Sequence, residues 1–225
     1  MENVIEIKKL SKSYEMGDTE VKVLDEIYLT VKKGEFSSIM GPSGSGKSTL
    51  LYLIGGLDKP TSGTIEIDGE ELSSMDDKQE SIMRRRKVGF IFQFYNLIPN
   101  LNVEENILLP ILLDGKKMKN HKNELDEILD IVGLTERRRH TPRELSGGQQ
   151  QRVAIARALI NDPEIILADE PIGNLDSKTG TGIMELFAKI NKQKGKTILQ
   201  VTHSKEAAEY GQRIINIKDG RVLLS

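Results

Sequence analysis

The chain has 225 residues, no cysteine, and 32 Lys and Arg against 34 Asp and Glu, for a formal net charge of −2. This length allows one sizeable domain with its own core. The lack of cysteine excludes disulfides and thiolate metal sites, and the near-neutral charge argues against binding nucleic acid by bulk electrostatics.

The apolar segments are short. The longest runs, 107–113 and 165–168, fall far short of the roughly 18–20 residues that a membrane-spanning helix needs. The first residues carry charges throughout and lack the apolar centre of a signal peptide. We therefore expect a cytoplasmic protein, peripheral on the inner face of the cell membrane if a partner attaches it there.

The first part of the chain alternates short strands with turns. Residues 4–7 and 21–31 are β-branched segments separated by Gly17 and Asp18, which predicts two antiparallel strands joined by a turn. The segments predicted after them are a buried strand at 36–40, a helix at 48–54, and strands at 64–67 and 88–92.

The character of the chain changes between residues 94 and 145. Apolar residues at helical spacing in 124–132 predict an amphipathic helix, and we interpret the whole stretch as a mostly helical insertion. Strand-like segments return at 165–168, 197–201 and 214–217 with helices between them, which predicts a parallel sheet.

Residues 41–49 read GPSGSGKST and follow a predicted strand. Glycines let the backbone curl so that its N–H groups cradle phosphates, Lys47 adds a cation near the β- and γ-phosphates, and the Ser48 hydroxyl can bind Mg²⁺. The helix that follows directs its positive end at the same place. The expected phosphate-binding residues are Gly41, Pro42, Ser43, Gly44, Ser45, Gly46, Lys47, Ser48 and Thr49.

The apolar run 165–168 ends in Asp169 and Glu170. Adjacent carboxylates at the end of a buried strand are costly unless cations or water take up their charge. We expect Asp169 to hold Mg²⁺, mostly through its water shell, and Glu170 to orient and deprotonate an attacking water. Two solvated acids at an exposed strand end are the alternative, which a phosphate loop in the same chain disfavours.

Residues 145–149 read LSGGQ and precede a helical segment. A serine hydroxyl, free N–H groups and a helix dipole form an anion-binding arrangement. An isolated Ser-Gly-Gly would more simply be a capped helix start, but here the full pentapeptide and the helix behind it favour a second anion site.

With both motifs in this order, the chain resembles the nucleotide-binding subunits of ABC transporters over its full length. The resemblance implies a single α/β domain over residues 1–225. Its P-loop (RecA-like) parallel sheet core, with an N-terminal antiparallel β subdomain, would span 1–93 and 146–225, and an inserted helical subdomain would span 94–145.

The resemblance also implies a head-to-tail homodimer that encloses two ATP molecules with Mg²⁺. The residues that match the family in this sequence are Tyr14, which would stack on adenine; Gln93, which would sense Mg²⁺ and water; Ser146, Gly147, Gly148 and Gln149, which would contact the partner's ATP; Asp176, in the loop crossing the interface; and the switch residue His203.

Segments 14–24, 39–49 and 92–99 are similar to the lipoprotein-releasing, macrolide-exporter and cell-division ATPases. This similarity implies an integral membrane permease as partner, and no nucleic acid. Ile172 stands where that subgroup usually has threonine, which puts the hydrogen bonding of the interface loop in doubt.

Three functions remain open at this point: an ATPase driving export or lipoprotein release, a force-transmitting ATPase that controls an extracytoplasmic enzyme, and a soluble relative acting on DNA or ribosomes. The absence of a tandem cassette and of a coiled-coil run disfavours the last. The apolar segment 94–99 either packs inside the helical subdomain or receives the membrane partner.

Overall fold

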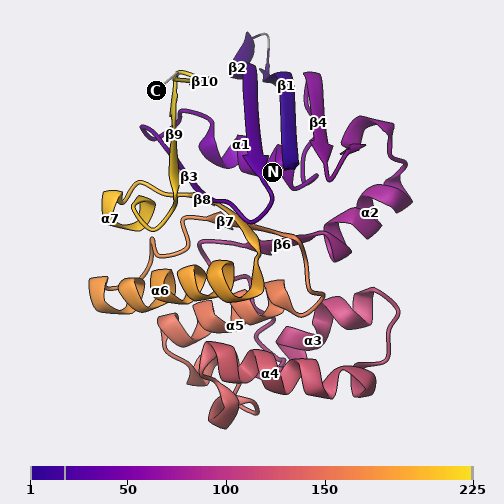
Figure 1. Cartoon of the computed structure of the whole chain (residues 1–225), viewed down its shortest axis with the longest axis vertical. Helices are drawn as coiled ribbons and strands as arrows, with labels where there is room; N and C mark the ends of the chain where they lie inside the picture. The colour runs from indigo at the N-terminus through magenta and orange to yellow at the C-terminus, as the bar shows by residue number, and fades with distance from the viewer. Residues whose placement is uncertain (1, 18, 224–225) are drawn as a thin grey trace.

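Two β-sheets, with helices between, beside and below them, make up residues 2–17 and 19–223, the part of the chain that this computed structural model describes (Figure 1). The upper sheet is antiparallel and has the strand order β2-β1-β4-β5. Its strands are β1 (Asn3–Met16), β2 (Thr19–Lys32), β4 (Ser62–Ile67) and β5 (Glu70–Glu71). The predicted antiparallel pair is confirmed and is longer than expected, whereas Asp18 lies outside the described residues.

The second sheet has the order β10-β9-β3-β8-β7-β6 and is parallel except for the edge pair β9–β10. Its strands are β3 (Phe36–Met40), β6 (Val88–Ile91), β7 (Ile165–Asp169), β8 (Thr197–Val201), β9 (Arg213–Lys218) and β10 (Arg221–Val222). The parallel sheet predicted from the alternation of strands and helices is therefore confirmed.

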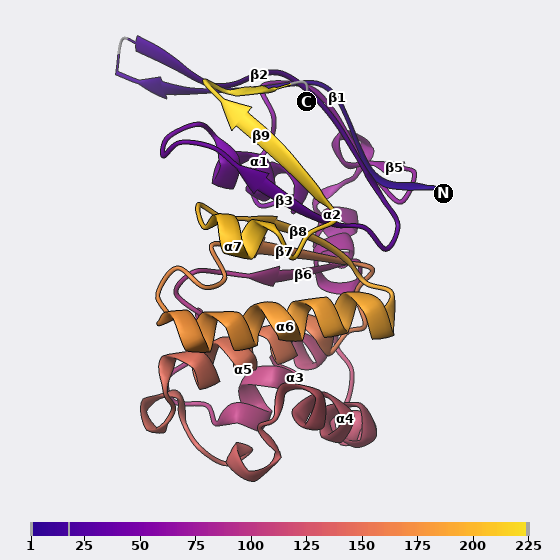
Figure 2. The same cartoon turned by 60° about the vertical axis from the view of Figure 1, so that its left-hand side comes forward.

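Helices cover both faces of this sheet. Helix α1 lies between the two sheets, whereas α6 and α5 lie against the other face with α3 and α4 beyond them (Figure 2). The helices are α1 (Lys47–Ile54), α2 (Asp77–Arg86), α3 (Val103–Leu113), α4 (Lys122–Val132), α5 (Gly147–Leu159), α6 (Ser177–Lys194) and α7 (Lys205–Ala208). None of the helices in the described ranges is long and apolar enough to cross a bilayer.

The parallel sheet separates two apolar cores, because successive side chains of a strand point to opposite faces. In β7, Ile165 and Leu167 join the core beneath the antiparallel sheet, while Ile166 and Ala168 join the core of the helices. Strand β7 is buried along its whole length, as expected for a strand covered on both faces.

The helical stretch predicted for 94–145 contains α3 and α4, and the amphipathic segment 124–132 lies within α4. Helix α5, which follows it, packs against α3 and α4 and also against β6 of the sheet. The division at residues 145 and 146 stays a prediction. Helix α2 was not predicted, since its sequence is almost entirely polar. It begins at a capping box between Asp76 and Gln79, which is a recognisable start pattern.

Candidate functional site

The loop between β3 and α1 depends on glycine at two positions. A Cβ added to Gly41 would lie 2.0 Å from the carbonyl oxygen of Ile217, and one added to Gly46 would lie 2.6 Å from Leu24 Cδ2. Gly44 has a φ of 77° and faces open space, because an added Cβ there would meet nothing within 4 Å. The backbone of this loop therefore packs tightly against β9 at Gly41 and against β2 at Gly46, where a larger residue would not fit.

Hydrogen-bond donors point into this loop. Lys47 Nζ donates to the carbonyls of Gly41 (3.0 Å) and Pro42 (2.8 Å), which leaves one of its three N–H groups for a ligand. The Ser45 hydroxyl is buried and has no hydrogen-bond partner among the described residues. Gly46 caps α1 without a side chain, so the first N–H groups of the helix are open. An orphaned hydroxyl beside unpaired N–H groups fits a bound phosphate chain.

Asp169 lies at the end of β7 next to the first turn of α1. Its Oδ1 accepts a hydrogen bond from Ser48 Oγ (2.9 Å) and its Oδ2 accepts one from the Tyr52 hydroxyl (2.7 Å). Burial, with the hydrogen bond to Asp169, raises the pKa of Tyr52 to about 12, so Tyr52 remains a donor at neutral pH. Sequence reasoning missed Tyr52, although a residue four positions after Ser48 on a helix shares its face.

Glu170 adopts a left-handed backbone conformation, with a φ of 46°. Its Oε2 lies 2.9 Å from Nδ1 of His203, but it accepts no hydrogen bond within the described ranges. The His203 side chain is 70% exposed, whereas that of Glu170 is 15% exposed. The pair therefore places a mostly buried carboxylate, whose Oε2 accepts no hydrogen bond in the described ranges, next to an exposed imidazole.

Gln93 follows β6 and lies beside the turn after Glu170. A Cβ added to Gly173 would lie 3.1 Å from Gln93 Nε2, and Asn174 Nδ2 donates to the Gln93 carbonyl (2.9 Å). Strands β3, β6, β7 and β8 end at one edge, since parallel strands align their carboxyl ends. The structure thus brings together six predicted site residues: Lys47, Ser48, Gln93, Asp169, Glu170 and His203.

The segment Ser146–Gln149 forms a separate structure at the start of α5. Ser146 Oγ accepts a hydrogen bond from the Gln149 N–H (3.3 Å), and Gln149 Oε1 accepts one from the Ser146 N–H (2.9 Å). Ser146 is exposed, while Gly148 is buried so closely that an added Cβ would lie 2.3 Å from Thr179 Cγ2. The sequence predicted open N–H groups here, and the structure shows that this capping box uses one of them.

Asp176 begins α6 in a similar way and accepts a hydrogen bond from the Thr179 N–H (3.0 Å). The hydrogen bonds from Thr179 lower the pKa of Asp176, so its carboxylate stays charged. Ile172, in the same connection, packs against the helical core and beside Gly180.

Tyr14 lies on β1 with its side chain 39% exposed, and its hydroxyl donates to Asp58 Oδ2 (2.7 Å). Asp58, on the connection after α1, was not predicted from the sequence. A link between residues 44 positions apart depends on the pairing of β1 with β4 and leaves no local pattern.

Known proteins are similar to this chain in sequence. The family profile described as ABC transporter matches residues 24–173. The lipoprotein-releasing system ATP-binding protein LolD of Aquifex aeolicus is 48% identical over 96% of this chain and 93% of its own. The macrolide export ATP-binding/permease protein MacB of Bdellovibrio bacteriovorus is 47% identical over 96% of this chain, but the match covers 33% of MacB.

A solved structure gives the same result in three dimensions. The dimeric post-hydrolysis state of the ATP-binding cassette MJ0796 of Methanocaldococcus jannaschii, bound to ADP and Pi, matches with a TM-score of 0.89. It is 48% identical, and the match covers 98% of this chain and 97% of MJ0796. The sequence resemblance, including the lipoprotein-releasing and macrolide-export subgroup, is confirmed. The chain belongs to the ABC transporter family and is one of its ATP-binding, ATP-hydrolysing cassettes.

Proposed function

We propose that two copies of this chain associate head to tail around two ATP molecules and that the dimer drives a membrane permease of the lipoprotein-releasing or macrolide-export type. The carrying observation is that the two anion-binding segments begin different helices, α1 and α5, which belong to different apolar cores. A single ATP would meet both segments if a second copy supplied one of them. The dimeric state of the MJ0796 cassette supports this arrangement.

In the proposed reaction Lys47 holds the β- and γ-phosphates with its remaining N–H group, and Ser146 of the second copy binds the γ-phosphate from the other side. Ser48 and Asp169 supply oxygen atoms that suit Mg²⁺, which commonly binds one or two protein oxygens together with phosphates and water. The Mg²⁺ would neutralise charge on the phosphates. Gln93 would orient the water beside it.

Glu170 acts as the base, because its Oε2 is free of hydrogen bonds and lies at the same edge as Asp169. It accepts the proton of the attacking water while the backbone keeps it in place through the bond from its N–H to the Val201 carbonyl (2.9 Å). His203 leaves Glu170 and donates to a γ-phosphate oxygen, which its exposure permits.

Glu170→Gln tests the dimer and the base together. The variant should lose hydrolysis by about 100-fold or more, because general-base catalysis is removed while the shape is kept. It should also retain ATP-dependent dimers on size-exclusion chromatography. Glu185→Gln, a change at an exposed position of α6, is the matched control and should behave as wild type. Full turnover in Glu170→Gln removes Glu170 as the base, and dimers that ignore ATP contradict the enclosed-nucleotide arrangement.

We infer the docking surface of the permease from a groove of about 410 Å³ between the region of α2 and β6 and helix α3. Its lining combines the exposed Leu57 and Leu113 with partly buried apolar residues and arginines: Phe90, Phe92, Leu109, Pro110, Arg84, Arg85 and Arg157. Arg157 donates to the carbonyls of Tyr95 and Asn96, and no acid pairs with it in the described part of the chain. An apolar segment of the permease with an acidic side chain would complement this lining. MacB, named an ATP-binding/permease protein, joins both functions in one chain.

In this proposal the segment 94–99 both packs against the helical core and contacts the membrane partner, the two roles considered from the sequence. Phe94 is 72% exposed near the groove, whereas Leu97 packs against the helical core. Phe94→Ala and Leu113→Ser should therefore reduce recovery of the permease in detergent extracts of ATP-loaded Glu170→Gln protein. Tyr28→Ser, at an exposed position on β2, is the control. Equal recovery of one polytopic protein by all these variants would place the docking surface elsewhere.

A further inference from the structure

The ring of Tyr14 has one face covered by a buried ammonium group. Lys12 lies two residues earlier on β1, and its Nζ is 4.6 Å from the centre of the Tyr14 ring. Lys12 is only 9% exposed, while Tyr14 is 39% exposed. A cation over an aromatic face is attracted to the π electrons on that side. The remaining exposure of the ring is thus available to another partner.

Asp58 joins these two side chains. One carboxylate oxygen, Oδ2, accepts from the Tyr14 hydroxyl (2.7 Å), and the other, Oδ1, accepts from Lys12 Nζ (2.8 Å) and from the Lys59 N–H (2.7 Å). Burial by itself would raise the pKa of Asp58, but the hydrogen bonds from Lys12 and Tyr14 outweigh it and hold the pKa below the usual carboxyl value. The carboxylate therefore stays ionised at neutral pH.

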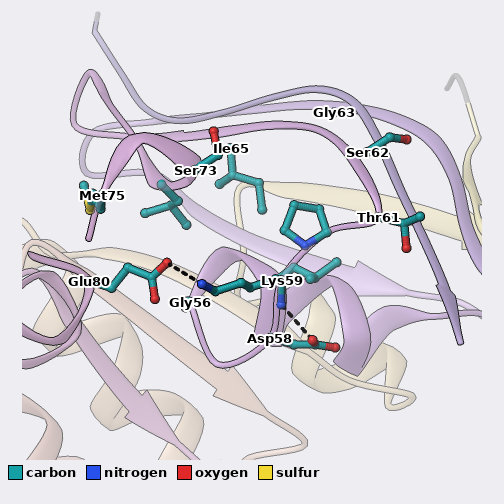
Figure 3. A pocket seen from close by; sticks show the side chains of 13 residues that line it. Gly56, Asp58, Lys59, Thr61, Ser62, Gly63, Ile65, Ser73, Met75 and Glu80 are labelled. Carbon is teal, nitrogen blue, oxygen red and sulfur yellow. Dashed lines mark hydrogen bonds and ion pairs between the residues drawn. The ribbon is translucent and has the colours of Figure 1, made fainter. Parts of the chain in front are cut away.

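Asp58 borders a cavity, so side-chain packing does not hold it on that side. A cavity of about 260 Å³ lies on the inner side of the connection that carries it, with Leu53, Ile65, Leu72 and Met75 as its apolar walls (Figure 3). In Figure 3 Lys59 extends across this space toward Glu80, and the two charged groups are 3.8 Å apart. With a cavity behind it, the connection is held on the other side by hydrogen bonds to β1, including those of Asp58 with Lys12 and Tyr14.

We propose that Asp58 and Lys12 are positioning residues for the nucleobase: they fix the Tyr14 ring with one face covered, so that adenine stacks on the opposite face. This inference rests on the proposed ATP-binding function and on the sequence-based expectation that Tyr14 stacks on the adenine of ATP. Fixing the two side-chain torsions of Tyr14 in advance avoids an ordering cost on binding. Because the effect acts through the ring, it concerns the base of the nucleotide and not its phosphates.

The test compares ADP with inorganic pyrophosphate, both with Mg²⁺, by calorimetric titration. ADP has the base but no γ-phosphate, so hydrolysis does not disturb the measurement. Tyr14→Ala should weaken ADP about tenfold, as expected for the loss of one stacked base. Asp58→Ala should weaken ADP about two- to tenfold, as expected for freeing one aromatic side chain. Neither variant should change the affinity for pyrophosphate.

Three further variants separate positioning from structure. Asp58→Asn should recover part of the ADP affinity, because its amide oxygen can accept from Lys12 Nζ and the Lys59 N–H while its NH₂ group donates to the Tyr14 hydroxyl oxygen. The double variant Tyr14→Phe/Asp58→Ala should bind ADP no more weakly than the poorer of its two single variants, because both changes release the same bond. Asp25→Ala, which removes the two ion pairs of Asp25 with Lys22 and Arg221, changes a carboxylate on β2 of the same sheet and should leave the preference for ADP unchanged.

The outcomes separate the positioning role of Asp58 from the adenine contact of Tyr14. Equal weakening of ADP and pyrophosphate by Asp58→Ala would show a general effect on the fold and overturn the positioning role. ADP binding that Tyr14→Ala weakens but Asp58→Ala does not would also overturn it, while leaving the adenine contact of Tyr14 intact. Wild-type affinity for ADP in Tyr14→Ala would overturn both the positioning role and the adenine contact.

Discussion

Helices α1 and α5 both begin at glycine-rich turns that suit an anion, but they treat their first N–H groups differently. Gly46, which precedes α1, has a φ of 92° and no side chain to act as a cap. The Ser146 hydroxyl, which precedes α5, accepts a hydrogen bond from the Gln149 N–H. The side-chain oxygen of Gln149 in turn accepts one from the Ser146 N–H. One helix start is open, and the other satisfies part of its own hydrogen bonding.

The two helix starts therefore differ in how many of their N–H groups still need a hydrogen-bond acceptor. The open start of α1 has donors that only water or a ligand satisfies, so phosphate binding completes it. At the start of α5 Ser146 is exposed, and the bond of 3.3 Å from Gln149 N to Ser146 Oγ is long. A cap of this kind contributes about 1 kcal/mol, so contact with a second copy can replace it at little cost.

The largest expected effect comes from adding a side chain at Gly46, the residue before α1. Gly46→Ala would force a Cβ to within 2.8 Å of the Val23 carbonyl oxygen at a positive φ, so the loop must move. We expect ATP affinity to fall by about 100-fold or more, because the N–H groups no longer converge on the phosphates. Fluorescent-nucleotide titration measures this loss.

Gly115→Ala is the matched control for that experiment. Gly115 also has a positive φ, 73°, but an added Cβ there would meet nothing within 4 Å. It should cost about 1 kcal/mol of unfolding free energy and leave ATP binding unchanged. Normal binding by Gly46→Ala would mean that the open start does not hold the phosphates.

Ser146→Asp separates capping from anion binding at α5. Aspartate is as good a cap as serine, so the unfolding free energy should stay within about 0.5 kcal/mol of wild type. Its charge opposes a phosphate, and we expect hydrolysis to fall by roughly 10- to 100-fold. Thermal unfolding and phosphate release measure the two effects. Unchanged hydrolysis would show that Ser146 serves α5 alone.

Mixing two inactive variants tests which copy supplies each helix start. In a head-to-tail dimer of Lys47→Ala with Ser146→Arg, one site carries both defects and the other carries none. Random pairing should then restore about a quarter of wild-type hydrolysis, since half the dimers are mixed and each has one intact site. Steady-state phosphate release of the mixture, compared with each variant alone, measures it. No recovery would contradict the head-to-tail arrangement.

A smaller effect, on the free energy of unfolding, is expected at the carboxyl end of α3. Asp114 follows α3, where a carboxylate is unfavourable to the helix dipole, but it is paired with Arg86 and Lys116. Burial opposes its ionisation, and the hydrogen bonds from Lys116 and Arg86 nevertheless keep its pKa below the usual value. Asp114→Asn should cost about 1–2 kcal/mol of unfolding free energy at pH 7.

The pH dependence of that cost follows from the lowered pKa. A carboxyl whose pKa is lower in the folded state stabilises fully above its unfolded pKa of about 3.9, and the contribution is lost as the pH falls through the folded pKa. The gap between wild type and Asp114→Asn should therefore be constant from pH 7 to about pH 5 and close below about pH 4. Urea unfolding at several pH values measures it, and a gap that does not narrow at all as the pH falls below about 4 would exclude the ion pairs as its cause.

The sequence was sufficient where function depends on consecutive residues. The loop 41–49 follows β3 directly, and the acids Asp169 and Glu170 lie at the end of β7, so their place at the carboxyl edge could be predicted. Tyr52, Asp58 and Asn174 act through partners 117, 44 and 81 positions away, and such contacts appear only when the sheets are assembled. At the start of α5 the sequence offered a capped helix start as the alternative to an anion site, but the hydrogen bond of Gln149 with the Ser146 N–H was not predicted.

The left-handed conformation of Glu170 sets the thermal stability of the chain against its proposed catalysis. An L-residue other than glycine pays about 1 kcal/mol for this backbone geometry, so Glu170→Gly should relieve strain and raise the melting temperature. The same change removes the carboxylate that we propose as the base. A directed-evolution campaign that rewarded heat resistance alone would thus tend to discard catalysis at this position, and position 170 should be held constant in any library built for thermostability.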